Sequence, residues 1–215
     1  MTTEVLSSEP ALGGLATRRE IRLTLVGPSG ATHSWVVLLY LPQGSSTAVP
    51  CFLGLNFSGN HTVHTDPGIT ESVVVEANFA GRAAGSAAER WQVEKIISRG
   101  MALATVYSGD VEPDDPTTAF TDGVHRLFAM AEPETWGTVA AWSWGLSRTL
   151  DLLLSAVPEV DGSKVRFLTD FHRFPTVFYH KMTILTMEND DGSSKVAVLG
   201  HSRKGKAALY EIHHF

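Results

Sequence analysis

The chain is 215 residues long, with 43% hydrophobic and 19% charged residues. This composition is typical of one folded domain with a sizeable core and excludes a disordered chain. The formal net charge of −6 argues against a nucleic acid as partner. No stretch approaches the roughly 18 apolar residues of a membrane span, and residues 1–17 lack the basic start and apolar block of a signal peptide. The single cysteine, Cys51, lies in an apolar run, where we expect a buried thiol.

The first quarter of the chain predicts a hairpin beside a buried strand. Residues 1–18 are small and polar, and we expect them to form a loose lead-in. Charged and apolar residues alternate over 19–26, a Gly-Pro turn follows, and 34–41 is apolar, which predicts a two-stranded hairpin at the edge of a sheet. The continuous apolar run 50–57 is typical of a strand that helices cover on both faces.

A strand, helix, strand unit and one long helix come next. After an irregular stretch that ends near residue 85, we predict a helix over 88–98 and a buried strand over 101–107, joined as a crossover. Apolar residues then step by three and four from Val139 to Val157, which predicts a long helix packed on the sheet. Trp142 and Trp144 lie in the middle of this helix, which favours core positions over a sugar-binding platform. The whole pattern predicts an α/β fold.

The segment 196–209 has the sequence VAVLGHSRKGKAAL. A β-type run breaks at Gly200 and resumes as helix formers, with Ser202 between the two. This is the pattern of a nucleophile elbow, in which a helix that starts behind the serine aims free N–H groups at a developing oxyanion. The second glycine departs from the general G-x-S-x-G pattern, because Lys204 occupies its usual place and Gly205 follows.

This shifted motif, G-x-S-R-x-G-K, resembles the elbow of the glucuronoyl esterases, carbohydrate esterase family 15. The segments 49–62, 97–110 and 141–151 are similar to the same family and occur in the same order. The resemblance implies a three-layer α/β hydrolase-like sandwich. Members of the family are typically secreted, whereas this sequence shows no signal peptide, so the compartment remains open.

The resemblance also implies an activity and its residues. The family cleaves the ester between 4-O-methyl-glucuronic acid on xylan and a lignin alcohol through an acyl-serine, without metal or organic cofactor. Ser202 matches the nucleophile, Arg203 the residue that faces the oxyanion, and Lys206 the lysine that binds sugar hydroxyls. Asn60 and His61 follow a buried strand, at the sheet edge where such folds bind ligands, and we expect them to line the pocket.

Other interpretations remain open. Ser202, Arg203 and Lys206 also suit an ordinary turn serine, a surface arginine and a solvated lysine. His61 and His64 are too few and too loosely placed to predict a metal site. The chain as a whole suits another carboxylesterase that acts on a small-molecule ester, or a noncatalytic, truncated product.

The sequence departs from the family pattern at two places. In the family the elbow strand follows directly after the position of Val165, but here residues 166–194 intervene. We interpret them as an insertion, or an intron translated in frame, that lies outside the sheet; the alternative is a surface hairpin built on 176–187. The chain also stops at Phe215, before the acid and histidine that follow the serine in such folds. His213 and His214 lie at the far end of the elbow helix and are poorly placed to serve as the base. We therefore expect residues 19–215 to form a hydrolase domain that is incomplete on its C-terminal side.

Overall fold

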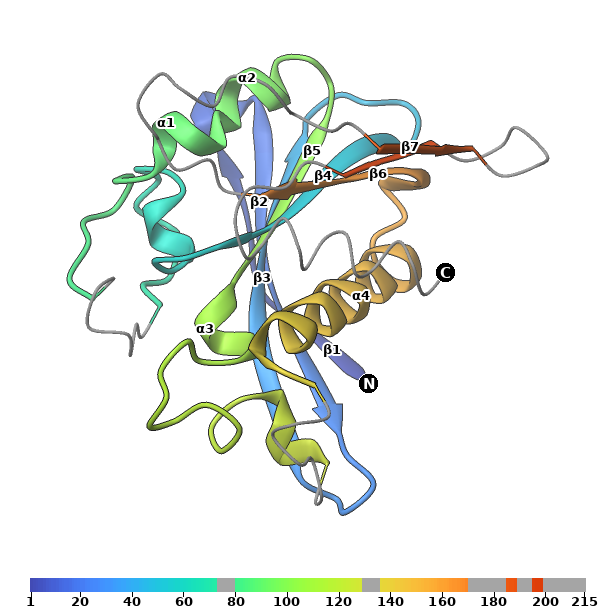
Figure 1. The fold of residues 1–215 in the computed structure, drawn as a ribbon. Helices are drawn as coiled ribbons and strands as arrows, with labels where there is room; N and C mark the ends of the chain where they lie inside the picture. Colours follow the sequence, from blue (N-terminus) through green and yellow to red (C-terminus); the bar gives the residue numbers. More distant parts are fainter. Residues whose placement is uncertain (73–79, 129–135, 170–184, 189–194, 199–215) are drawn as a thin grey trace, which may run out of the picture.

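The computed structural model describes residues 1–72, 80–128, 136–169, 185–188 and 195–198, the last two ranges and 166–169 as backbone only. A mixed sheet runs through the centre of this part, with strands in the spatial order β1-β2-β3-β5-β4-β6-β8-β7 (Figure 1). The strands are β1 (Thr2–Ala11), β2 (Ala16–Val26), β3 (Thr32–Pro42), β4 (Val49–Asn56), β5 (Ala102–Tyr107), β6 (Val160–Thr169), β7 (Leu185–Glu188) and β8 (Lys195–Val198). The α-helices are α1 (Ala88–Trp91), α2 (Val93–Ile97), α3 (Ser108–Val111) and α4 (Thr138–Ala156), and 3-10 turns cover Leu12–Gly14, Asn60–Thr62 and Val124–Leu127.

Helices cover both faces of the sheet, as a three-layer α/β architecture requires. Figure 1 shows α1 and α2 on one side of the strands and α4 on the other. Strand β3 shows how the sequence divides between them, because side chains alternate across a strand. Val37 and Leu39 belong to the core cluster under α4, whereas Leu38 and Tyr40 belong to the cluster under α1 and α2. The expected α/β fold class is confirmed.

The N-terminal segment corrects one expectation. Residues Thr2–Ala11 are not a loose lead-in: they form β1, which pairs antiparallel with β2 from Thr2↔Thr24 to Ala11↔Ala16. The predicted hairpin of β2 and β3 is confirmed, but it is not the edge of the sheet, since β1 takes that place. Most β1 side chains are exposed, so the strand is held mainly by backbone hydrogen bonds to β2. Its sequence has no alternation of apolar and polar residues from which a strand could be predicted.

The helix expected over 88–98 is broken into α1 and α2. Gln92, between them, has a left-handed backbone with φ 46°. Trp91 and Val93 are both 1% exposed, although residues two apart point to different sides of a continuous helix. The break at Gln92 therefore lets both side chains reach the sheet.

Helix α4 confirms the predicted long helix and packs on β4 and β6. Its close fit to α3 depends on one residue without a side chain. A Cβ atom placed on Gly145 would lie 2.4 Å from Val111 Cγ1, well inside van der Waals contact. Trp142 is 1% exposed and belongs to the core, as expected, whereas Trp144 is half-buried.

The expectation that residues 166–194 lie outside the sheet is wrong at two places. Residues 166–169 continue β6, which pairs parallel with β4 from Cys51↔Val165 to Leu55↔Thr169. They lie inside the sheet because they complete the ladder along β4, which would otherwise end in unpaired backbone groups. Leu185–Glu188, also within this range, forms β7 and pairs antiparallel with β8 at the edge of the sheet. Residues 171, 174 and 178, the phenylalanines whose places would test the prediction further, lie outside the described residues.

Two further observations concern the described part of the chain. Cys51 is 1% exposed, and burial raises the pKa of its thiol to about 12, which confirms an inert buried cysteine. None of the helices described here is long and apolar enough to span a membrane.

Candidate active-site edge

The candidate site lies at the edge of the sheet where the parallel strands β4 and β5 end. Their last residues, Asn56 and Tyr107, pair with one another, so the loops that follow both strands start side by side. In α/β sheets ligands bind outside the carboxyl ends of the strands. The loop after β4 and the loop after β5, which includes α3, therefore form the walls of the candidate site.

Asn56 fixes the loop after β4. Its Nδ2 donates to Asn60 Oδ1 at 2.7 Å and to Thr105 Oγ1 at 3.2 Å, and its Oδ1 accepts from the Gly59 N–H at 3.0 Å. Gly59 has φ 96°, and a Cβ there would lie 2.7 Å from His61 Cε1, so only glycine fits. The turn after β4 is thus rigid.

Asn60 is buried, at 2% exposure, and holds the same turn to the sheet. Its Nδ2 donates to the Val36 carbonyl at 3.0 Å, and its backbone N–H donates to Ser72 Oγ at 2.9 Å. The sequence placed Asn60 correctly at the carboxyl edge. Both ends of its side-chain amide are engaged within the protein, so in this structure its contribution is to shape the wall.

His61 borders a cavity of about 320 Å³, together with Asp66, Glu71 and Arg82. Its Nδ1 accepts from the Ser72 N–H at 3.3 Å and its Nε2 donates to the Arg82 carbonyl at 3.0 Å, which defines the neutral tautomer with the proton on Nε2. Because both ring nitrogens are used, His61 is a wall residue in this arrangement and not a free base.

A polar cluster lies behind this cavity and joins the loop to the sheet. Arg18 on β2 forms a 2.8 Å ion pair with Asp66, and Tyr40 on β3 donates to the second Asp66 oxygen at 3.0 Å. Burial opposes ionisation of Asp66, but hydrogen bonds from the Gly68 N–H and from Arg18 outweigh it and hold the pKa below its ordinary value. Burial, with the Asp66 charge, raises the pKa of Tyr40. Glu20, 2% exposed, accepts from the Thr70 N–H and hydroxyl at 2.9 and 2.7 Å.

His64, the other histidine that the sequence raised as a metal ligand, is used in the same scaffold. Its Nδ1 accepts from the Asp66 N–H at 3.0 Å, and its Nε2 lies 2.7 Å from Glu94 Oε1. The hydrogen bond from His64 lowers the pKa of Glu94. Within the described residues, no group of three or more His, Cys, Asp and Glu side chains is arranged to hold a metal ion.

The loop after β5 contains a buried pair that the sequence did not reveal. Glu112 and His125 are 0% and 1% exposed, and His125 Nδ1 lies 2.9 Å from Glu112 Oε2. The two atoms are within ion-pair distance, but His125 Nδ1 makes no hydrogen bond in the structure. His125 Nε2 donates to the Trp136 carbonyl at 3.1 Å, so the ring has no side free for a substrate. The pair has the residue types of an acid–base dyad but is placed to hold the loop.

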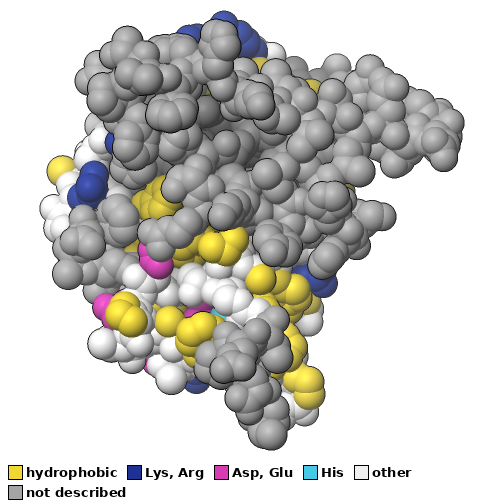
Figure 2. All heavy atoms as spheres, viewed as in Figure 1, with side chains coloured by type: hydrophobic (Ala, Val, Ile, Leu, Met, Phe, Trp, Pro, Cys, Tyr) yellow, Lys and Arg dark blue, Asp and Glu magenta, His cyan; other side chains and the backbone are white. Residues whose placement is uncertain are grey.

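Several contacts bind this pair into the wall. Glu112 accepts from the Phe120 N–H at 2.6 Å, and its carbonyl accepts from the Trp142 indole at 2.8 Å. The His125 ring packs at a tilt against Phe120 and Trp136, with centroids 4.6 and 4.2 Å away. The space-filling view shows apolar side chains grouped on this half of the molecule, around α3 and α4 (Figure 2). The sequence pattern does not predict this contact, because Glu112 and His125 lie thirteen positions apart in an irregular loop.

Ser202, Arg203 and Lys206 lie outside the described residues, so their placement stays a prediction. The strand that leads to them is described as far as Val198. β8 pairs parallel with β6 through Phe167↔Val198, and β6 pairs parallel with β4. β8 therefore runs in the same direction as β4, toward the edge of the sheet where β4 ends at Asn56.

A mixed sheet with helices on both faces and loops gathered at the carboxyl edge defines the α/β hydrolase class, of which this chain carries a part. Comparison with known proteins narrows the class. No family model matches the chain. Carbohydrate esterase MZ0003, from an unknown prokaryotic organism, is 37% identical over 217 aligned positions, which cover 94% of this chain and 42% of that protein.

Solved structures agree. Two structures of a glucuronoyl esterase from Solibacter usitatus have TM-scores of 0.70 and 0.73 at 37% and 33% identity, covering 78% and 98% of this chain and 45% and 48% of theirs. A promiscuous CE15 esterase from the marine bacterial metagenome has a TM-score of 0.65 at 33% identity, with 98% and 49% coverage. The resemblance to carbohydrate esterase family 15 is thus confirmed. The chain spans less than half the length of these relatives.

Proposed function

We propose that the protein is a serine carboxylic-ester hydrolase that cleaves glucuronate esters, of the kind that join 4-O-methyl-glucuronic acid on xylan to lignin alcohols. The observation that carries the proposal is the likeness at 33–37% identity to proteins described as glucuronoyl esterases, together with the G-x-S-R-x-G-K motif at 200–206. The direction of β8 supports it. Val198 is level with Phe167 and hence with Leu53, three residues before the end of β4.

In this proposal Ser202 Oγ attacks the ester carbonyl, the alcohol leaves, and water releases glucuronate from the acyl-serine. Arg203 faces the oxyanion and Lys206 binds sugar hydroxyls. A serine hydroxyl needs an oriented base. The structure gives His61, His64 and His125 hydrogen-bond or ion-pair partners at both ring nitrogens. By the chain order of α/β hydrolases, we place the base and its acid after the elbow.

We further propose that 166–194 was inserted into one hydrolase domain that starts with β1, with its first four residues extending β6 and Leu185–Glu188 forming β7. The sequence DGSKV at 161–165, just before this segment, is nearly repeated as DGSSKV at 191–196, which begins within the end of the segment. Such a repeat is what a segment inserted at the start of the elbow strand would leave.

The test is hydrolysis of benzyl and methyl glucuronate esters. We expect no serine-dependent turnover from residues 1–215 alone, and turnover from a chain with 166–194 removed and a family-like continuation after Leu209. In the continued chain Ser202→Ala abolishes activity and Lys206→Ala raises KM more than it lowers kcat, while Ser163→Ala, at an exposed serine, is the control. Loss of a whole triad costs roughly 10⁶ in kcat. An inactive continued chain, or one indifferent to Ser202→Ala, contradicts the proposal.

A broader carboxylesterase activity is the second candidate, favoured by the likeness to an esterase described as promiscuous. Lys206 distinguishes the two proposed activities, since a simple acyl ester has no sugar hydroxyls for Lys206 to bind. Lys206→Ala should weaken hydrolysis of glucuronate esters and leave p-nitrophenyl acetate unchanged. Equal effects on both substrates favour the broader activity.

A further inference from the structure

A second cavity lies at the opposite edge of the sheet from the candidate active site. It has a volume of about 510 Å³, within the range of small-ligand sites. Its walls are the start of β2, the end of β3, the connection 43–48 and the turn between α4 and β6. The eight residues of β4 separate the two edges by about 25 Å, at roughly 3.3 Å per residue. A ligand here therefore lies far from the carboxyl ends of β4 and β5.

The walls of this cavity are held in place by the backbone. The Gln43 N–H donates to the Leu15 carbonyl at 2.9 Å, and the Val49 N–H donates to the Glu159 carbonyl at 2.8 Å. These two bonds fix both ends of the connection between β3 and β4. Gln43 also donates to the Thr17 hydroxyl. The cavity is thus preformed, which lowers the entropic cost of binding.

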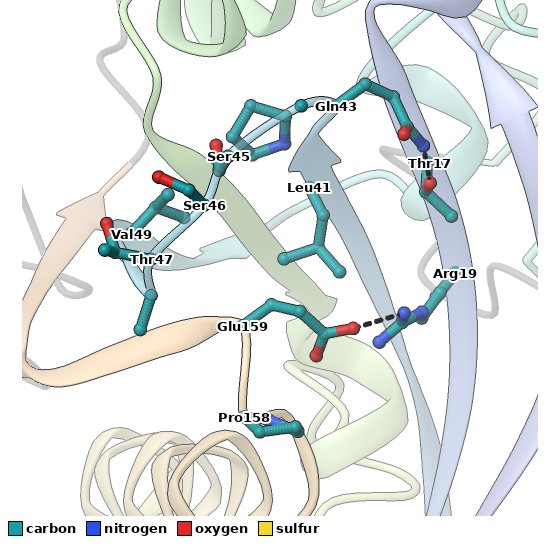
Figure 3. Close-up of a pocket in the computed structure, with 13 residues that line it drawn as sticks. Thr17, Arg19, Leu41, Gln43, Ser45, Ser46, Thr47, Val49, Pro158 and Glu159 are labelled. Carbon is teal, nitrogen blue, oxygen red and sulfur yellow. Dashed lines mark hydrogen bonds and ion pairs between the residues drawn. The ribbon is translucent and has the colours of Figure 1, made fainter.

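The charges that face the cavity cancel. Arg19 and Glu159 form a 2.5 Å ion pair across it, with side chains 24% and 43% exposed (Figure 3). The hydrogen bond from Arg19 holds the pKa of Glu159 below its ordinary value, so the pair is fully ionised at neutral pH. None of the other lining residues carries a charge. An anionic or cationic ligand would gain no net attraction here.

Hydrogen-bonding capacity remains within the same pair. A guanidinium carries five N–H donors, of which Arg19 directs one at Glu159 Oε1, while Glu159 Oε2 has no hydrogen-bond partner in the structure. The connection adds the hydroxyls of Ser45, Ser46 and Thr47. Vicinal hydroxyls, each of which donates and accepts, match this set of donors and acceptors.

The cavity also has an apolar surface. Leu41 points into it between the ion pair and the connection, and Pro158 lies below, next to Glu159 (Figure 3). A sugar ring presents C–H groups on its faces and hydroxyls at its rim, which suits an apolar patch surrounded by polar groups. We propose that this cavity binds a neutral pyranose oligosaccharide, as a second saccharide site independent of the serine chemistry proposed above.

Binding is tested on the 215-residue chain by NMR titration with xylotriose, with sodium glucuronate as the anionic probe. We expect millimolar binding of xylotriose, weaker binding of glucuronate, and shifted amide signals at Thr17, Gln43 and Thr47. Arg19→Gln should weaken binding by about tenfold, or about 1.4 kcal/mol. The matched control is Arg22→Gln, because Arg22 forms a similar ion pair with Glu4 on the exposed side of the same strand.

Further variants distinguish loss of binding at this cavity from misfolding and from binding at the candidate active site. Ser46→Ala combined with Thr47→Val alters only exposed side chains and should also weaken binding, while Ser202→Ala should leave it unchanged. Absence of binding at millimolar xylotriose overturns the proposal. So do tighter binding of glucuronate, shifts confined to the loops after β4 and β5, or equal effects of Arg19→Gln and Arg22→Gln. The esterase proposal is tested separately by Ser202-dependent hydrolysis, so failure of one proposal is distinguishable from failure of the other.

Discussion

The two faces of the sheet are covered in different ways. Under α4 lies a continuous apolar cluster that includes Trp35, Trp142 and Leu146. On the other face α1 and α2 are short, and much of the cover is the loop after β4, joined to the sheet by the part-buried pair Arg18–Asp66 and by Glu20. An apolar core tolerates exchange of one apolar side chain for another of similar volume, whereas a buried charge destabilises the fold when its partner is removed. The loop that shapes the candidate site thus depends on a few specific side chains.

The largest expected effect is on the apolar face. Trp142→Ala removes a side chain that is 1% exposed and leaves the Glu112 carbonyl without its indole donor, so we expect a loss of about 3–5 kcal/mol in the free energy of unfolding. Urea denaturation followed by circular dichroism measures it. Leu154→Ala, at a residue of the same helix that is 55% exposed, is the control and should change stability by less than about 0.5 kcal/mol. Similar losses for both would contradict the assignment of α4's buried face.

On the polar face, Arg18→Met should cost about 3 kcal/mol, near the low end for breaking a buried pair, because Asp66 keeps its bonds from Tyr40 and Gly68. Replacing both partners, as Arg18→Met with Asp66→Leu, should recover part of this loss, since no charge is then left unpaired. A double-mutant cycle in urea measures the coupling. Additive losses would show that the pair does not act as a unit.

The contrast between the faces also explains what the sequence could predict. The periodicity from Val139 to Val157 reflects one apolar helix face packed on the sheet. The apolar runs of β3, β4 and β5 reflect burial on both faces of the sheet, and these elements were predicted correctly. β1 was missed because its exposed faces carry no pattern. The break at Gln92 was missed because it depends on the sheet surface that Trp91 and Val93 must reach.

The candidate site shows the same division. Asn60 and His61 could be placed at the carboxyl edge because they follow a recognisable buried strand. That both side chains are committed to hydrogen bonds within the protein depends on Val36, Ser72 and Arg82, which are distant in sequence. The Glu112–His125 pair has no local pattern for the same reason.

A smaller effect is expected where α4 meets α3. Gly145→Ala places a Cβ against Val111, and we expect a net loss of about 1–2 kcal/mol: overpacking costs about 1–3 kcal/mol and the gain in helix propensity returns part of it. Gly145→Ala with Val111→Ala should restore much of the loss by making room. Thermal unfolding of both variants decides. A stabilised single variant would contradict the close contact.

The smallest expected effect is the response to acid. The pKa of Asp66 is lower in the folded chain than its ordinary value of 3.8, so its contribution to stability is present above that value and is lost as the pH falls through the folded pKa. Unfolding of the parent chain should therefore become easier below about pH 4, and Asp66→Asn should flatten this dependence. Urea midpoints at several pH values measure it. The same acid slope in Asp66→Asn would assign the effect to other carboxyls.

We propose that Ser202 is the nucleophile of a carboxylic-ester hydrolase whose active site is bounded by the loops after β4 and β5. The most direct measurement is labelling of the continued chain with a serine-directed phosphonate ester, followed by mass spectrometry of the peptides. We predict a single adduct on Ser202, lost in Ser202→Ala and reduced when glucuronate ester competes. An adduct on a different serine, or labelling of Ser202 that an excess of substrate leaves unchanged, would contradict the account.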